Sequence, residues 1–275
     1  RIKSIFADIT ADDARAKGYL KGNKKVEEVF TLLKRSTTPT TIYKKQKMDR
    51  DDVVDITDFD VVSWIKSEMR VMLDEEIARA ILVGDGRSTA SDDKINESNI
   101  RPIWKDDSLY TIKATVQLGA SETETTKGKK FIKAVLKARK NYKGSGNPIL
   151  LTTEDVLTDL LLIEDTNGRN IYESVDKLAT ALRVSKIVTS PVLENQTRAG
   201  VELVDGDTKT RTLMGIIVNL ADYTVGADKG GAVNLFEDFD IDFNQQKYLI
   251  ETRCSGALTK PYSAIAIESM EESAG

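Results

Sequence analysis

The chain has 275 residues, of which 40% are apolar and 31% are charged, and its formal net charge is −4. This balance supports a core in one large domain or two small ones, and it argues against a dedicated nucleic-acid binder, which normally carries a basic excess. There is no histidine and only one cysteine, Cys254, which excludes Ser-His-Asp triads, imidazole metal sites and an internal disulfide framework.

The N-terminal region is predicted to be mostly extended. Residues 1–14 predict an arm with a short helical tendency. Residues 14–48 have a turn signal at Gly22-Asn23 and, in their second half, many Thr, Val, Phe, Ile and Tyr residues. Because few of these side chains could form a core, we expect a long β-hairpin that projects from the body.

A long amphipathic helix is predicted at residues 58–83. Thr57 and Asp60 have the spacing of a capping box, and Gly84 is a typical helix stop. About 26 residues at about 1.5 Å each give a rod of about 39 Å. The apolar stripe consists of Val62, Ile65, Met69, Leu73, Ile77 and Ile81. Further apolar side chains widen it, namely Val61, Trp64, Met72 and Leu82. We therefore expect the helix to be covered on more than one side.

The rest of the chain mixes helix and strand patterns. Residues 88–127 are mostly polar and predict an insertion or loop, and residues 129–142 predict a basic amphipathic helix. A turn-rich boundary follows at 143–148. Strand patterns then occur at 149–153, 185–193, 215–225, 234–244 and 246–268, and helix patterns at 153–169 and 175–184. This order predicts an α+β fold with a segment inserted between the long helix and the last strands.

Three kinds of motif could carry chemistry, and each has a simpler explanation. The GDGR motif at Gly84–Arg87 lacks phosphate-loop spacing and follows a helix. The acidic clusters at 49–52 and 205–207 lack EF-hand spacing and fit surface turns. Alternation of Asp238, Asp240 and Asp242 with Phe239, Ile241 and Phe243 predicts the exposed and buried faces of one strand.

No catalytic constellation, cofactor site or metal site is predicted. Cys254 is interpreted as a small buried residue in a strand. No run of about 18 apolar residues predicts a membrane span, and no signal peptide is visible.

Charge is sorted into two adjacent blocks. Residues 1–50 carry 13 Lys and Arg against 6 Asp and Glu, a net of +7, whereas residues 51–86 carry 3 against 10, a net of −7. Both blocks could be solvated faces. Alternatively, the basic hairpin of one copy could lie on the acidic helix of another, since complementary charge sets register and steers association.

Long stretches of the chain resemble the major capsid proteins of tailed double-stranded-DNA phages, which have the Hong Kong 97-type fold. The resemblance covers most of the chain and is strongest over residues 38–87 and over residues 247–268, with Arg253, Gly256 and Pro261. It implies an N-terminal arm at 1–14, an extended E loop at 15–47, a P domain at 48–143 with a spine helix at 58–83, an A domain at 144–232 and a return to the P domain at 233–275.

The resemblance also implies contacts between subunits. In this family the E loop lies over a neighbouring subunit, and the A domain surrounds the centre of hexamers and pentamers. The expected basic residues of the E loop are Lys17, Lys21, Lys24, Lys25, Lys34 and Arg35. Their expected partners on a neighbour's spine helix are Asp58, Asp60, Glu68, Asp74 and Glu75. Some relatives form a lysine–asparagine cross-link, but no motif here selects a lysine.

The function implied is that of a structural head protein that assembles into an icosahedral shell around double-stranded DNA. Expected partners are further copies, a portal, and scaffolding, protease or decoration proteins, with no membrane and no sequence-specific DNA contact. The implied location is the virion capsid, assembled in the bacterial host cytoplasm. The Arg1 start is consistent with removal of a leader, and equally with residues that precede Arg1. One alternative is an encapsulin-like shell that houses an enzyme cargo. The other is an enzyme that uses carboxylate chemistry, and the absence of histidine argues against this second alternative.

Overall fold

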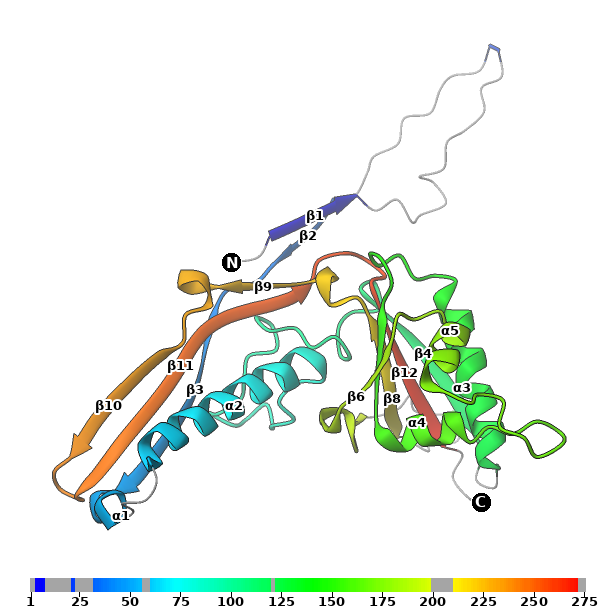
Figure 1. Cartoon of the computed structure of the whole chain (residues 1–275). Coiled ribbons are helices and arrows are strands. Elements are labelled where there is room, and N and C mark those ends of the chain that lie inside the picture. The colour runs from blue at the N-terminus through cyan, green and yellow to red at the C-terminus, as the bar shows by residue number, and fades with distance from the viewer. Residues whose placement is uncertain are drawn as a thin grey trace.

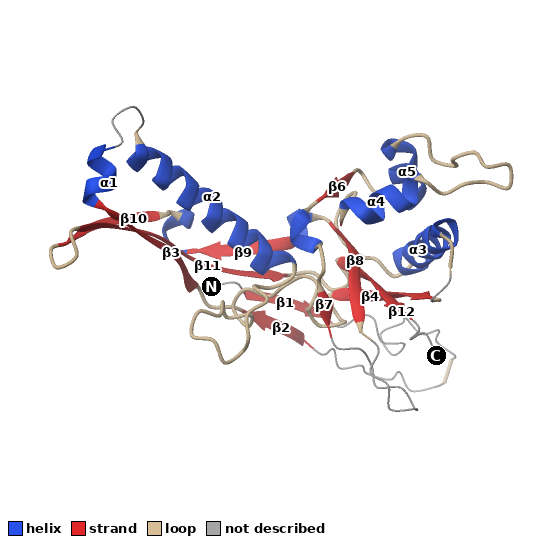
Figure 2. Cartoon of the chain, turned by 90° about the horizontal axis from the view of Figure 1, so that it is seen from below, coloured by secondary structure: helices blue, strands red, loops and turns tan. Residues whose placement is uncertain are grey.

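The computed structural model describes residues 3–7, 21–22, 32–55, 60–119, 122–198 and 210–271. The molecule is elongated, with two lobes and a separate two-stranded sheet that lies outside both (Figure 1). We call the lobe that contains α2 the first lobe and the lobe that contains α3, α4 and α5 the second lobe; Figure 2 shows them from below. The separate sheet pairs β1 (Lys3–Ala7) with β2 (Leu32–Ser36) in antiparallel register.

The first lobe is a twisted four-stranded sheet covered by one long helix. Its central strand β11 (Gln245–Leu258) pairs antiparallel with β3 (Thr40–Asp49), β10 (Asn234–Asp240) and β9 (Tyr223–Ala227). The short helix α1 (Arg50–Asp55) follows β3, and α2 (Val61–Leu82) lies across the sheet. Ile65, Met69 and Leu73 of α2 share a buried cluster with Tyr248 and Ile250 of β11.

The ends of α2 follow from local chemistry. The Asp60 carboxylate accepts a hydrogen bond from the Ser63 backbone N–H at 3.0 Å and so caps the first turn. At the other end Gly84 has a φ of +92°, and its N–H donates to the Arg79 carbonyl at 2.9 Å. This left-handed conformation costs glycine little. The long helix predicted from the sequence is confirmed, although Thr57 lies outside the described residues.

The second lobe is built on a mixed six-stranded sheet with the order β4-β12-β8-β5-β6, to which β7 is added beside β8. The strands are β4 (Thr111–Leu118), β5 (Ile149–Thr152), β6 (Ile187–Thr189), β7 (Thr197–Arg198), β8 (Arg211–Val218) and β12 (Ala264–Glu271). The helices are α3 (Glu124–Arg139), α4 (Glu154–Leu161) and α5 (Val175–Leu182), with short turns at η2 (Pro191–Leu193), η3 (Leu220–Asp222) and η4 (Asp228–Gly231).

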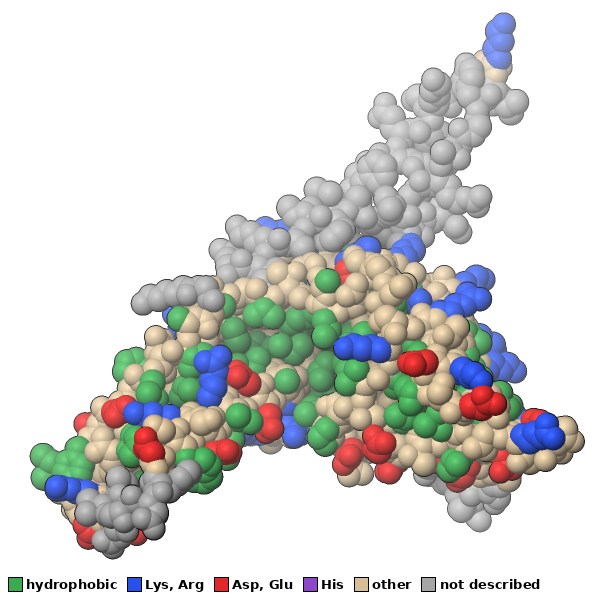
Figure 3. Space-filling view, viewed as in Figure 1, with side chains coloured by type: hydrophobic (Ala, Val, Ile, Leu, Met, Phe, Trp, Pro, Cys, Tyr) green, Lys and Arg blue, Asp and Glu red, His purple; other side chains and the backbone are tan. Residues whose placement is uncertain are grey.

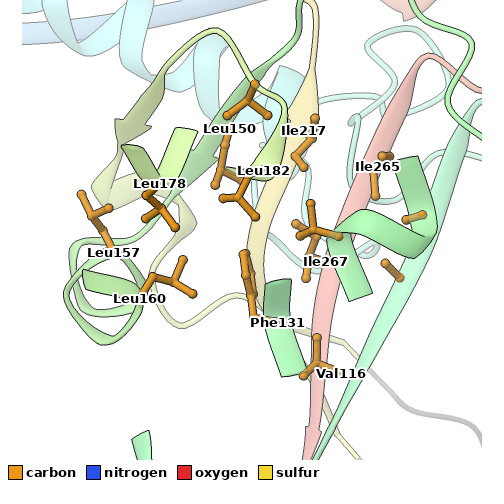
Figure 4. Close-up of a cluster of buried hydrophobic side chains, with 14 of the residues drawn as sticks. Val116, Phe131, Leu150, Leu157, Leu160, Leu178, Leu182, Ile217, Ile265 and Ile267 are labelled. Carbon is orange, nitrogen blue, oxygen red and sulfur yellow. The ribbon is translucent and has the colours of Figure 1, made fainter. Parts of the chain in front are cut away.

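The core of the second lobe lies between this sheet and the three helices (Figure 4). Phe131 of α3, Leu160 of α4 and Leu182 of α5 are almost fully buried there against Ile217 and Ile267 of the sheet. Helix α4 begins where the Thr153 hydroxyl accepts from the Val156 N–H at 3.3 Å. Because the helices share this core with β12, the last strand belongs structurally to the second lobe.

The packing corrects several sequence-based boundaries. Residues 3–7, predicted to have a helical tendency, form β1, because they pair with β2 in one hairpin. The predicted E loop ended at residue 47, but β3 lies in the sheet of the first lobe. The sequence-based division placed β4, α3 and the last strand in the P domain, whereas β4 and β12 pair in parallel within the second lobe and α3 packs against both.

Two further predictions were wrong in detail. Residues 88–127 are not wholly loop, since they include β4 and the start of α3, and the loop before β4 buries Ile103 and Trp104. The single strand predicted at 215–225 is divided into β8 and β9, because the Asn219 side chain accepts from the Ala221 N–H at 3.1 Å and turns the chain from one sheet to the other.

Candidate assembly surfaces

No group of three or more His, Cys, Asp or Glu side chains within the described residues could hold a metal ion. Cys254 is buried in β11, as predicted, and burial raises the pKa of its thiol. None of the helices in the described ranges is both long and apolar enough to cross a membrane. The candidate functional features described next are exposed surfaces.

The end of β2 is fixed to the body by a buried ion pair. Arg35, only 4% exposed, donates from Nη2 to both carboxylate oxygens of Asp106 at 2.6 and 2.7 Å. Its Nη1 donates to the Leu258 carbonyl at 2.9 Å, and the guanidinium lies 3.9 Å from the centre of the Tyr110 ring. The sequence had placed Arg35 among residues that contact a neighbour. The structure corrects this prediction, because the Arg35 guanidinium is already bonded to Asp106 and Leu258 of its own chain. There it fixes the orientation of β2.

The outer face of α2 is apolar and acidic. Trp64, Val71 and Met72 are 51%, 49% and 46% exposed, so the cover expected on more than one side is not supplied by the described residues of the same chain. A groove of about 250 Å³ lies between α2 and the edge strand β3, and Met72 and Glu75 line it opposite Tyr43 and Lys44. An exposed apolar face with a charged border is typical of an interaction surface.

The predicted contact residues have different surroundings. Lys21 and Lys34 are exposed, as are Asp60, Asp74 and Glu75, while Glu68 is half-buried. Asp74 pairs with Arg70 on the next turn at 3.0 Å, and Asp60 caps α2. Lys17, Lys24, Lys25 and Asp58 lie outside the described residues. No ion pair joins the described lysines of the hairpin to α2 within the chain, so the predicted pairs stay a prediction about neighbours.

The tip of the first lobe exposes apolar side chains that the sequence pattern placed in a core. Phe239, Ile241 and Phe243 are 38%, 84% and 69% exposed, and apolar side chains are visible at the far end of this lobe in Figure 3. The alternating pattern therefore does not bury one face. The reason is that β10 is an edge strand whose turn extends beyond α2.

A charged cluster lies inside the second lobe. Glu268 is fully buried and accepts hydrogen bonds from Trp104 Nε1 and Arg198 Nη2, each at 2.7 Å. Burial acts to raise the pKa of Glu268, but the bonds from Arg198 and Trp104 outweigh it and leave the pKa below its usual range. Burial and repulsion by Arg198 lower the pKa of nearby Lys113 to about 8. Since both oxygens of the Glu268 carboxylate accept hydrogen bonds from its own chain, we assign this charged cluster a structural role.

The described residues form two lobes, a two-stranded sheet outside both and several exposed apolar faces, which suit contacts with other protein chains. The comparisons agree with this interpretation. The model of the phage capsid family matches residues 2–269, and the chain belongs to that family. It is a structural major capsid protein of the virion, and the encapsulin-like alternative is not favoured. Comparison with curated protein sequences gave no match.

Solved structures confirm the Hong Kong 97-type fold. A chain from Mycobacterium phage Ogopogo is 12% identical with a TM-score of 0.63, and the match covers 98% of this chain and 86% of that one. A chain from Gordonia phage Cozz is 11% identical with a TM-score of 0.61, covering 98% and 81%. The capsid of a native GTA particle is 10% identical with a TM-score of 0.62, covering 98% and 84%.

Proposed function

We propose that copies of this chain form hexamers and pentamers that close into an icosahedral shell around phage double-stranded DNA, and that the hairpin of each copy lies over α2 of a neighbour. The observation that carries the hairpin contact is that the β1–β2 sheet pairs with neither main sheet, although Arg35 at the end of β2 ties it to the body of its own chain. A two-stranded sheet is marginal in water unless it packs against another surface. The half-exposed apolar side chains of α2 offer such a surface.

Charge complements this apolar contact. Lys21 and Lys34 of the hairpin are exposed, and Glu75 lies in the groove beside α2. Glu68 and Glu75 make no ion pair within the described residues, unlike Asp74, so they are the best acidic partners. Exposed pairs of this kind contribute only about 0–1 kcal/mol each. Many weak contacts suit a shell that corrects errors as it closes.

The same proposal covers the other partners. DNA fills the shell without sequence-specific contacts, which agrees with the net charge of −4. The further partners of the shell are a portal protein and scaffolding, protease or decoration proteins. The role is structural rather than catalytic, and the absence of histidine from the sequence supports this.

Electron microscopy of the purified protein, with its A260/A280 ratio, tests the proposal. Closed angular shells that contain nucleic acid are expected. Particles of one or two subunits under all salt conditions would refute it. For the hairpin contact, Glu75→Lys should lower the yield of shells while subunit melting temperature is retained. Glu194→Lys, an exposed change of equal charge in the second lobe, is the control, and equal yields from the two variants would count against the contact.

A further inference from the structure

The longest helix of the second lobe, α3, carries a shallow, open basic surface, which we call the basic groove. Ile132 and Leu136 form part of it, Leu136 being 40% exposed, and α3 and the residue that follows it supply all of its lining. Four lysines border it: Lys129, Lys133, Lys137 and Lys140. None of these four forms an ion pair with another described residue, whereas Lys130, beside them on α3, pairs with Glu122. Lys and Arg side chains are visible along this edge of the molecule in Figure 3.

The loop between α4 and α5 has the complementary features. Leu162 and Ile171 at its base are 53% and 45% exposed. Residues 162–173 carry three acidic side chains, Glu164, Asp165 and Glu173, against one basic side chain. Figures 1 and 2 both show this loop projecting beyond the helices of the lobe. We call residues 162–173 the acidic loop.

The acidic loop is held in shape by its own hydrogen bonds. The Ile171 N–H donates to the Ile163 carbonyl and the Asp165 N–H to the Arg169 carbonyl, both at 2.8 Å. The Asp165 carboxylate accepts from the N–H groups of Asn167 and Arg169 at 2.7 and 3.1 Å. A projecting segment that is already ordered loses little conformational entropy when it binds.

We propose that the basic groove on α3 of one copy receives the acidic loop of the adjacent copy. The inference rests on the proposed function, because it requires copies to assemble side by side. The loop does not fill the groove of its own chain: its base meets the first turn of α3, where the Glu164 N–H donates to Thr125 Oγ1 at 3.4 Å. A contact between two different surfaces of identical chains is heterologous, and it generates closed rings when the rotation closes.

The chemistry of the groove favours protein over nucleic acid. Each surface presents two aliphatic side chains within a border of charge, with opposite signs on the two sides. An apolar centre with a polar border is the usual anatomy of a protein interface. Contacts to a nucleic-acid backbone use mainly hydrogen bonds and charge, and they leave no role for the exposed Leu136.

Charge reversal tests the proposal. Lys133→Glu/Lys137→Glu should raise the protein concentration needed for shell formation by about fivefold for each reversed lysine, as expected for exposed ion pairs. Adding Glu164→Lys to the same chain should restore part of the assembly; Glu173 is left unchanged because it already pairs with Lys177 of its own α5. Lys186→Glu, an exposed lysine elsewhere in the second lobe, is the control and should leave assembly unchanged. If the reversal lowers the melting temperature of the subunit, Lys133→Gln/Lys137→Gln replaces it.

The outcomes separate this inference from the proposed function. If the wild-type chain forms shells and the reversed groove assembles equally well, the inference is wrong and the proposed function stands. Normal assembly with reduced DNA retention would overturn it in favour of a nucleic-acid contact. If the wild-type chain forms no shells, both are overturned.

Discussion

The pair between Arg35 and Asp106 makes a quantitative prediction. In Asp106→Asn the shape of the side chain is kept, but the buried Arg35 guanidinium loses the carboxylate that it contacts at 2.6 and 2.7 Å. Breaking a buried pair by removing one partner costs about 3–5 kcal/mol. The Leu258 carbonyl and the Tyr110 ring still contact Arg35, so we expect about 3 kcal/mol, the lower end of that range.

A double-mutant cycle separates the pair from its surroundings. Arg35→Met should also destabilise, because the Asp106 carboxylate, 2% exposed, is left buried without its cation. The double variant Arg35→Met/Asp106→Leu should be more stable than the sum of the single effects by at least about 2 kcal/mol. The assay is urea unfolding of dissociated subunits, followed by circular dichroism. The reasoning would be refuted if either single variant lost less than about 1 kcal/mol of unfolding free energy, or if the two losses simply added in the double variant.

Three further predictions concern single side chains. Phe131→Ala, at the centre of the second-lobe core, should cost about 3–5 kcal/mol in the same assay, and a cost below about 1 kcal/mol would show that this core is not close-packed. Gly84→Ala should destabilise by about 1 kcal/mol or more, because φ is +92° and the new Cβ would meet Glu97 Oε1 at 2.7 Å; an unchanged melting temperature would contradict this. Lys113 has a folded-state pKa of about 8, below the ordinary 10.5, so the unfolded chain binds more protons between these values. Stability from this group should therefore rise with pH across that window, by at most about 1.4 kcal/mol per pH unit. Lys113→Met should lack this rise, and equal slopes in the two proteins would exclude it.

Local patterns explain which elements the sequence could predict. Helix α2 was predictable because its buried residues recur at helical spacing and Gly84 ends it in a conformation suited to glycine. The α+β class followed in the same way. Strand β1 was missed because its structure depends on pairing with β2, which is distant in sequence. Strand β4 was assigned to a loop region, and its parallel pairing with β12 across about half the chain has no local signal.

The candidate surfaces were predicted less completely. The charge blocks indicated the hairpin and α2, and those contacts stay predictions between copies. Arg35 could not be separated from the lysine beside it by charge alone, since its burial depends on Asp106 and Leu258. The one available signal was its identity as arginine, which suits buried bidentate pairs better than lysine does. The apolar residues near the end of β10 were assigned to a core because alternation does not show where a sheet ends.

The positions of the two tryptophans give this protein a built-in optical readout. Trp64 lies half-exposed on α2, whereas Trp104 is buried in the second lobe with its indole N–H bonded to Glu268. Emission from a half-exposed indole shifts to shorter wavelength when a surface covers it, and emission from a buried indole shifts to longer wavelength when water enters. Variants that keep only one of the two would report docking and unfolding separately. The emission wavelength of Trp64 could then distinguish a folded free subunit from a subunit within a shell, without any attached label.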